Sequence, residues 1–156
     1  MKALIQRVTR GSVSVDGQTI GAVQQGYVVL LGVRQGDTEA DARHLAKKTA
    51  GLRVFPDAQG RMNLSVVEIG GGVLVISQFT LYADTRKGHR PGFTEAAGPA
   101  EAERLYESYV GCLRTMLGNG RVATGLFRAM MQVELVNDGP VTIELTTDHR
   151  RGVQGG

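Results

Sequence analysis

The sequence predicts a single α+β domain over residues 1–156, built from mainly antiparallel strands with two main helices. Expected strands are grouped towards both ends of the chain, with helical segments between them, an order that does not suit a doubly wound parallel sheet. Glycine is abundant at 22 residues and proline scarce at 4, which favours many tight turns over a disordered chain. Hydrophobic residues make up 42% and charged residues 21%, which are ordinary values for one globular domain.

The first three predicted strands come before residue 34. Residues 3–15 alternate between apolar and polar side chains, and Asp16 with Gly17 then supplies a hairpin turn into a return strand over residues 19–23. Residues 26–33 are almost wholly apolar, which is typical of a strand covered on both faces.

Two helices are indicated by the residues at their ends. The first begins near Thr38, where Thr38 and Asp41 resemble a capping box, and it stops at Gly51. The second begins at Pro99, a residue suited to the first helical position, and it ends at residues 118–120. Its apolar face is expected to carry Leu105, Tyr109, Cys112, Leu113 and Met116.

The segment between the helices contains one more predicted strand and two loops. A polar loop surrounds residues 56–60, and a central strand follows over residues 73–81. Residues 82–98 have no sustained periodicity and are expected to form a long exposed loop, of a length that is usually functional or mobile. This loop carries Arg86, Lys87, His89 and Arg90.

The end of the chain is expected to return to strands. Residues 121–127, 130–136 and 141–147 have strand patterns, and residues 137–140 are interpreted as a turn between the last two. Residues 148–156 are expected to form a frayed tail of the same domain.

Charge and cysteine content exclude several classes of protein. A net charge of +3 is too small to establish a duplex-DNA-binding protein, although it allows contact with a phosphate-rich end of an RNA. One cysteine, Cys112, excludes an internal disulfide and a multi-thiolate metal site. Because neither a signal-peptide pattern nor a membrane-spanning apolar run is present, we expect a cytoplasmic protein with no membrane partner.

Familiar catalytic motifs are missing from the sequence. It has no dinucleotide-binding or phosphate-binding glycine loop and no nucleophile elbow of the Gly-x-Ser-x-Gly type. The histidines His44, His89 and His149 are scattered without neighbouring ligand residues, so we predict no metal and no cofactor. Cys112 is interpreted as a small hydrophobic residue of the second helix rather than as a nucleophile.

Two segments place polar residues where they need an explanation. Ser77-Gln78-Phe79-Thr80 ends a buried apolar strand, so its hydrogen-bonding side chains require partners from protein, water or a ligand. The pattern alone favours the simpler interpretation of a strand that leaves the core for solvent. Asn137-Asp138-Gly139-Pro140-Val141-Thr142 likewise has a purely structural interpretation as a turn before a strand.

Taken together, the two segments resemble the D-aminoacyl-tRNA deacylases. SQFTL and NDGPVT match the two signature motifs of that family. The resemblance continues in MKALIQRV, FPDAQGRMNLS, LYADTRKGHRPGF and TGLFRAMMQVELVNDGPVTIEL, and so covers nearly the whole chain in order.

The resemblance implies a compact, β-rich homodimer with an active site at each end of the subunit interface. Gly139 and Pro140 would form a cis pair inserted into the pocket of the partner subunit. By the same resemblance Gln78, Phe79 and Thr80 are the candidate catalytic residues, and the candidate substrate-binding residues are Ser77, Gly139, Pro140, Met130 and Arg7, with Arg7 supporting the Gly-Pro loop.

The implied substrate is the ester between a D-amino acid, or glycine, and the 3′-terminal ribose of tRNA. Such an ester is already activated, so positioning and main-chain N–H groups near Phe79 and Thr80 can supply much of the acceleration. The 2′-hydroxyl of the substrate is proposed for this family to help activate water. Thr80 is ranked as a positioning residue before a nucleophile, because no base is visible beside it.

Three positions depart from the pattern of the family, and two other functions compete. His89 and Gly92 stand where the family more often has Arg and Ser, and Arg128 stands where it usually has Gly. An inactive RNA-binding or editing domain, like the related appendage of some threonyl-tRNA synthetases, is the main alternative. A small-molecule esterase is disfavoured because no Ser-His-acid set can be assembled.

Overall fold

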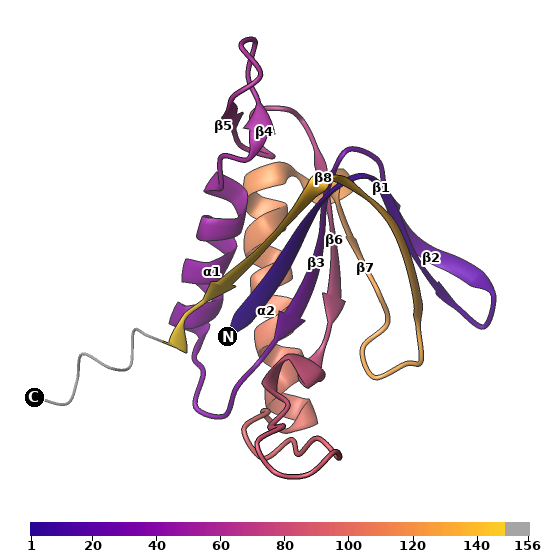
Figure 1. Ribbon diagram of the computed structural model, residues 1–156, viewed down its shortest axis with the longest axis vertical. Helices are drawn as coiled ribbons and strands as arrows, with labels where there is room; N and C mark the ends of the chain where they lie inside the picture. Colours follow the sequence, from indigo (N-terminus) through magenta and orange to yellow (C-terminus); the bar gives the residue numbers. More distant parts are fainter. Residues whose placement is uncertain (149–156) are drawn as a thin grey trace, which may run out of the picture.

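One long N-terminal strand organises the sheet of the protein. The computed structural model describes residues 1–148 (Figure 1). In it β1 (Lys2–Val15) pairs antiparallel with β2 (Gln18–Val23), β3 (Gly26–Gly32) and β8 (Gln132–Thr146). The predicted hairpin turn at Asp16 and Gly17 is confirmed, and both residues have the positive φ angles that such a turn requires.

The sheet continues beyond β3 with parallel strands, so it is mixed. β3 pairs in parallel with β6 (Gly72–Ser77), and β6 pairs in parallel with β7 (Val122–Thr124). A Cβ atom on Gly26 would lie 1.8 Å from the carbonyl oxygen of Gly72, so the close approach of β3 and β6 requires a glycine there.

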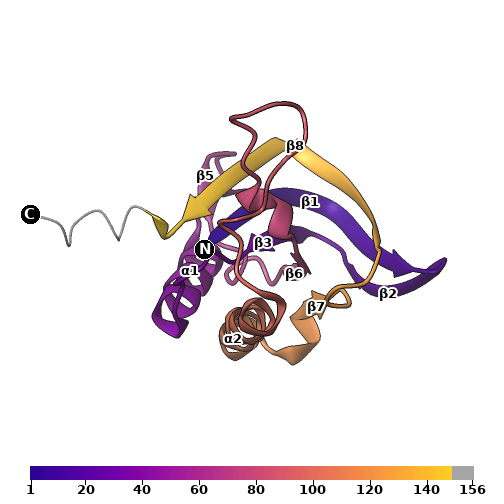
Figure 2. The same ribbon diagram turned by 90° about the horizontal axis from the view of Figure 1, so that it is seen from below.

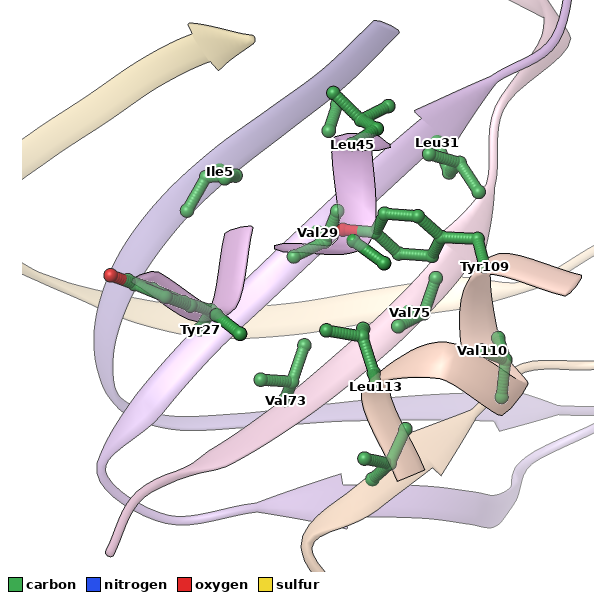
Figure 3. Close-up of a cluster of buried hydrophobic side chains, with 14 of the residues drawn as sticks. Ile5, Tyr27, Val29, Leu31, Leu45, Val73, Val75, Tyr109, Val110 and Leu113 are labelled. Carbon is green, nitrogen blue, oxygen red and sulfur yellow. The ribbon is translucent and has the colours of Figure 1, made fainter. Parts of the chain in front are cut away.

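Both helices pack against the same face of the sheet (Figures 1 and 2). α1 (Glu39–Gly51) begins at the predicted cap, where the side chains of Thr38 and Asp41 each accept from the backbone N–H of the other residue. α2 (Pro99–Leu117) begins at its proline and ends at Gly118, as predicted. The main core fills the space between the helices and β1, β3 and β6, and Figure 3 shows part of it around Tyr109 and Leu45.

The loop predicted around residues 56–60 is the turn of a small hairpin. β4 (Phe55–Pro56) pairs antiparallel with β5 (Met62–Leu64). The Asp57 carboxylate accepts hydrogen bonds from the backbone N–H of Arg61 at 3.0 Å and of Gln59 at 2.9 Å, and from the Asn63 side chain at 3.1 Å. These bonds, that of Arg61 first, hold the pKa of Asp57 below its usual value despite the opposing effect of burial.

Two predicted strands are shorter than expected. The strand predicted over residues 73–81 ends at Ser77 and gives way to the 3₁₀ turn η1 (Phe79–Tyr82). The strand predicted over residues 121–127 is reduced to β7, preceded by a second 3₁₀ turn, η2 (Asn119–Arg121). Apolar residues continue past both strands, so a pattern of side chains alone could not locate where hydrogen bonding ends.

The expected frayed tail needs one correction. Asp148 is held in place, because its carboxylate accepts a hydrogen bond from the Tyr82 hydroxyl at 2.9 Å and lies 3.6 Å from the Met1 ammonium group. Residues 149–156 lie outside the described residues.

Candidate active site

The first candidate segment forms a short turn at the end of β6. The backbone N–H of Gln78 donates to the carbonyl oxygen of Leu31 at 2.8 Å, and this backbone hydrogen bond to β3 comes directly after the end of β6. η1 is then closed by Leu81 N–H donating to Gln78 at 3.3 Å and by Ala83 N–H donating to Thr80 at 3.1 Å. The first N–H groups of any helical turn have no acceptor within it, and here they belong to Phe79 and Thr80.

The side chains of this turn are accessible to a substrate. Phe79 is 55% exposed, Thr80 is exposed, and Ser77 and Gln78 are half-buried. The Gln78 amide donates a hydrogen bond to the Thr80 hydroxyl. A neutral amide cannot remove a proton from a hydroxyl group, so this contact orients Thr80 without activating it as a nucleophile.

The second candidate segment is a bulge in β8, and the predicted turn between two strands is wrong. Gln6 of β1 pairs with Thr142, and Val8 pairs with Asn137. Residues 138–141 therefore lie opposite Arg7 alone, and both parts of β8 run antiparallel to β1. The chain does not reverse direction here. We call residues 138–141 the Gly-Pro loop; its Gly139–Pro140 peptide bond is cis, and both of these residues are exposed.

Two side chains fix the shape of the Gly-Pro loop. Asn137 spans it: its Oδ1 accepts from Val141 N–H at 2.7 Å, and its Nδ2 donates to the Val141 carbonyl at 3.2 Å and to Thr142 Oγ1 at 3.1 Å. Arg7 Nε donates to the carbonyl of Asp138 at 2.9 Å, and the same guanidinium group donates to the carbonyl of Val54.

Asn137 was not singled out by sequence reasoning. The available signal was an Asn that precedes a glycine and a proline, because Asn side chains commonly bond to backbone groups a few residues away. Arg7, in contrast, lies where the resemblance places it, beside the Gly-Pro loop.

The two candidate segments are separated within one chain. Ser77 lies beside Leu31 of β3, and Leu31 lies opposite Ala3 of β1, whereas the Gly-Pro loop lies opposite Arg7. Four residues of β-strand span about 13 Å. The segments also lie on different sides of β1, so one chain does not bring them together.

Met130 lies on the connection between β7 and β8, which begins beside β6. Gly125 N–H donates to the carbonyl of Val75 at 3.3 Å, which holds the connection between β7 and β8 against β6. Met130 is 90% exposed and Leu126 is 55% exposed. Arg128 has a φ of 66°, an unusual value for a non-glycine residue, at the position where the family resemblance leads us to expect Gly.

The basic loop over residues 82–98 folds back onto η1, where Phe93 contacts Phe79. The rings of Phe93 and Phe79 meet edge to face, with centroids 4.9 Å apart. Arg86, Lys87 and Arg90 of this loop are exposed, as are His89 and Gly92. Arg86 pairs with Asp84 at 2.8 Å, and its side-chain hydrogen bonds, followed by its backbone N–H, lower the pKa of Asp84 to about 2.

Other candidate groups contribute no site among residues 1–148. No cluster of three His, Cys, Asp or Glu residues suited to a metal ion occurs in that part of the chain, and His149 lies outside it. Cys112 is half-buried against the core of the protein. Within the same residues, no helix has the length and apolar character needed to cross a membrane.

The sequence is similar to those of D-aminoacyl-tRNA deacylases over most of its length. Residues 4–146 match the model of a family described as D-Tyr-tRNA(Tyr) deacylase. The chain is 60% identical to a D-aminoacyl-tRNA deacylase of Anaeromyxobacter dehalogenans, over 97% of this chain and 99% of the relative. It is 59% identical to a D-aminoacyl-tRNA deacylase of Heliobacterium modesticaldum, over 92% of this chain and 94% of the relative.

Two solved structures are similar to the whole domain. One is a c-Myc DNA unwinding element binding protein, with a TM-score of 0.90 and 42% identity over 94% of this chain and 99% of that one. The other, described as a probable eukaryotic D-amino acid tRNA deacylase, has a TM-score of 0.78 over 92% of this chain and 97% of that one. At 16% identity the second likeness supports the α+β fold alone.

Proposed function

Because the chain belongs to the D-Tyr-tRNA(Tyr) deacylase family, we propose that it hydrolyses the ester joining a D-amino acid to the 3′ end of tRNA and that it rejects L-aminoacyl-tRNA at the Gly-Pro loop. The protein is a hydrolase of the D-aminoacyl-tRNA deacylase type. The proposed mechanism of hydrolysis and of L-aminoacyl-tRNA rejection rests on two accessible motifs. One follows the end of β6, and the other forms the bulge in β8.

Hydrolysis is assigned to main-chain groups of the turn at Phe79 and Thr80. Attack of water on the ester carbonyl creates a negatively charged oxygen, which the N–H groups of Phe79 and Thr80 can stabilise. Gln78 orients the Thr80 hydroxyl towards the substrate, and the exposed ring of Phe79 offers an apolar surface to it. The adjacent 2′-hydroxyl of the ribose assists the water, so the site needs no side-chain base.

Chirality is read by the Gly-Pro loop. The carbonyl oxygens of Gly139 and Pro140 hold the ammonium group of the substrate, which fixes the direction of its side chain. A D side chain then points outward, while an L side chain collides with a loop stiffened by Asn137 and Arg7. A thousandfold preference corresponds to only about 4 kcal/mol, and a steric clash in a stiff pocket can supply that much. Glycine has no side chain to collide, so glycyl-tRNA is also a substrate.

A complete site requires two subunits. Within one chain the Gly-Pro loop lies on the other side of β1 from the turn at Phe79, so we propose a homodimer in which each loop enters the pocket of the partner. Phe79, Leu126 and Met130 are exposed apolar side chains that such a contact can cover. Loss of the partner would then remove the chirality filter from each pocket.

The partner of the site is the 3′ end of a tRNA in the cytoplasm, and not duplex DNA. The net charge of +3 is small for a duplex-binding protein, although one neighbour of the same fold is named for binding a DNA element. The exposed basic side chains on the loop after η1, namely Arg86, Lys87 and Arg90 with His89 among them, suit a limited contact with phosphates.

A deacylation assay separates this proposal from its alternatives. The purified protein is incubated with D-tyrosyl-tRNA, L-tyrosyl-tRNA and glycyl-tRNA, and the remaining ester is measured over time. We expect rapid loss of the D-tyrosyl and glycyl esters and no loss of the L-tyrosyl ester. Binding without hydrolysis would instead support the inactive editing-type domain, and cleavage of a simple ester such as p-nitrophenyl acetate at a similar rate would support a small-molecule esterase.

A further inference from the structure

We propose that Tyr82 is a positioning residue for the turn at Phe79 and Thr80, acting through its hydrogen bond to Asp148. This inference rests on the proposed role of that turn in deacylation. Tyr82 is the last residue of η1, is 3% exposed, and donates its hydroxyl to the Asp148 carboxylate at 2.9 Å. Its ring also lies beneath the Lys2 ammonium group, which is 4.8 Å from the ring centroid.

Asp148 is itself a firm point of attachment. Its carboxylate lies 3.6 Å from the ammonium group of Met1, and its N–H donates to Thr146 Oγ1 at 3.1 Å. The Met1 ammonium group is fixed in turn by the buried Asp37 carboxylate at 2.9 Å and by Thr147 Oγ1 at 2.7 Å. Tyr82 therefore connects the turn to both the start of β1 and the end of β8.

The charges around Asp148 favour its ionised form. Burial alone would raise the pKa of Asp148, but the Tyr82 hydroxyl, then the Met1 ammonium group, Arg34 and Lys2 together lower it. Burial, followed by the Asp148 carboxylate, raises the pKa of Tyr82 far above its usual value. The hydroxyl group thus remains a donor and the carboxylate an acceptor across the pH range in which the protein is expected to act.

The position of Tyr82 in such a short turn connects it with the candidate catalytic N–H groups. η1 contains four residues, fixed at its start by the bond from Gln78 to Leu31. A Cβ atom on Gly32 would lie 3.0 Å from the Leu81 side chain and 3.3 Å from the Tyr82 ring, so the turn packs directly on β3. Tyr82 is the second attachment of the turn, and releasing it frees Phe79 and Thr80 to move.

Tyr106 provides a matched control, because it is a buried tyrosine whose hydroxyl bonds neither to η1 nor to Asp148. It is also 3% exposed, and its hydroxyl donates to the carbonyl of Val75 at 2.8 Å from the middle of α2. Tyr82→Phe and Tyr106→Phe each remove one buried hydroxyl donor, so both are expected to lower Tm, Tyr82→Phe somewhat more because its acceptor is a charged carboxylate. Of the two substitutions, only Tyr82→Phe removes a hydrogen bond that holds η1 in place.

The experiment compares kcat and KM for D-tyrosyl-tRNA in the wild-type protein, Tyr82→Phe and Tyr106→Phe. We expect kcat to fall about fivefold to tenfold in Tyr82→Phe with KM little changed, which is the loss expected for one hydrogen bond that orients reacting groups. Tyr106→Phe keeps the wild-type kcat. Asp148→Ala reproduces the loss, while Asp148→Asn, which retains an acceptor oxygen, recovers most of it.

A second measurement does not depend on activity. Amide hydrogen exchange of Leu81 and Ala83, whose N–H groups close η1, is expected to be faster in Tyr82→Phe than in Tyr106→Phe. An unchanged kcat in Tyr82→Phe, an equal loss in Tyr106→Phe, or unchanged exchange at Leu81 and Ala83 overturns the inference. If the wild-type protein cleaves D-tyrosyl-tRNA while these results are negative, the role of Tyr82 fails and the proposed function stands.

Discussion

Gly139 combines a backbone conformation and a close contact that other residues tolerate poorly. Its φ is 144°, and a Cβ atom would lie 2.8 Å from Val141 Cγ2 and 3.0 Å from Val141 N. We predict that Gly139→Ala displaces the Gly-Pro loop and lowers kcat/KM for D-tyrosyl-tRNA more than tenfold, which corresponds to a loss of at least about 1.4 kcal/mol. Gly60→Ala is the control, because Gly60 has a φ of 77° and no atom within 4 Å of its added Cβ. Equal activities in the two variants would contradict the role of the loop.

Thr80 and Cys112 distinguish a main-chain mechanism from a nucleophilic one. The Thr80 hydroxyl has the Gln78 amide beside it, and Cys112 packs against the core. We predict that Thr80→Ala loses activity modestly, about tenfold in kcat, and that Cys112→Ala retains it. Single-turnover rates on D-tyrosyl-tRNA provide the measurement. A loss of several thousandfold in Thr80→Ala with unchanged binding would identify Thr80 as a nucleophile.

Asp84 offers a test of the basic loop by titration. The side chain of Arg86 lowers the pKa of this carboxyl group to about 2, so the ionised form is favoured in the folded protein. Its contribution to stability is therefore present above about pH 4 and is lost as the pH falls towards 2. A carboxyl ¹³C NMR titration should show Asp84 changing near pH 2 in the wild type and closer to 4 in Arg86→Ala. A pKa near 4 in both would mean that the pair is absent in solution.

Among the elements, those with local end signals were predicted well. Thr38 with Asp41, Pro99 and Gly118 mark helix ends through bonds that form within a few residues, so the sequence contains the necessary information. The end of β6 depends instead on a bond from Gln78 to Leu31, a residue distant in sequence.

The prediction of a turn within β8 was wrong for a different reason. Asn-Asp-Gly-Pro has the composition of a turn, but the residues on both sides of it pair with the same neighbour, β1. Strand partners are not visible in one sequence, so a bulge and a reversing turn have the same local pattern. The pattern of residues therefore predicted a reversing turn where the structure has a bulge within one strand.

The bulge in β8 depends on Asn137, which bonds across it to Val141 and Thr142. We predict that Asn137→Ala lowers the free energy of unfolding by about 1–3 kcal/mol, because Val141 loses its hydrogen-bond partners, and also lowers kcat/KM. Chemical denaturation and the deacylation assay measure the two effects. Asn119→Ala, a change at an exposed residue of η2, should alter neither. A neutral result at Asn137 would show that Arg7 alone maintains the loop.

At the scale of the whole molecule, the proposed division of the site between two chains can be tested by mixing variants. In the proposed homodimer, Gly139→Ala damages the loop that one chain inserts into its partner. Thr80→Pro removes a main-chain N–H from the pocket of the chain that carries the substitution. Each homodimer is expected to have little activity. After joint unfolding and refolding of equal amounts, half of the dimers combine both chains and each has one intact site, so about a quarter of the wild-type activity should return. No recovery, with mixed dimers confirmed by mass, would place the whole site within one chain.

The main-chain composition of the Gly-Pro loop limits how mutations can alter a chirality filter of this kind. It presents main-chain oxygen atoms, and no codon change can delete an oxygen of the peptide backbone. Mutations can only move or obstruct these atoms, as a methyl group at Gly139 would do. In the proposed mechanism these oxygens bind the ammonium group that all amino acids share, so the site does not discriminate between outward-pointing side chains. If the filter works in this way, one gene can protect translation against many different D-amino acids.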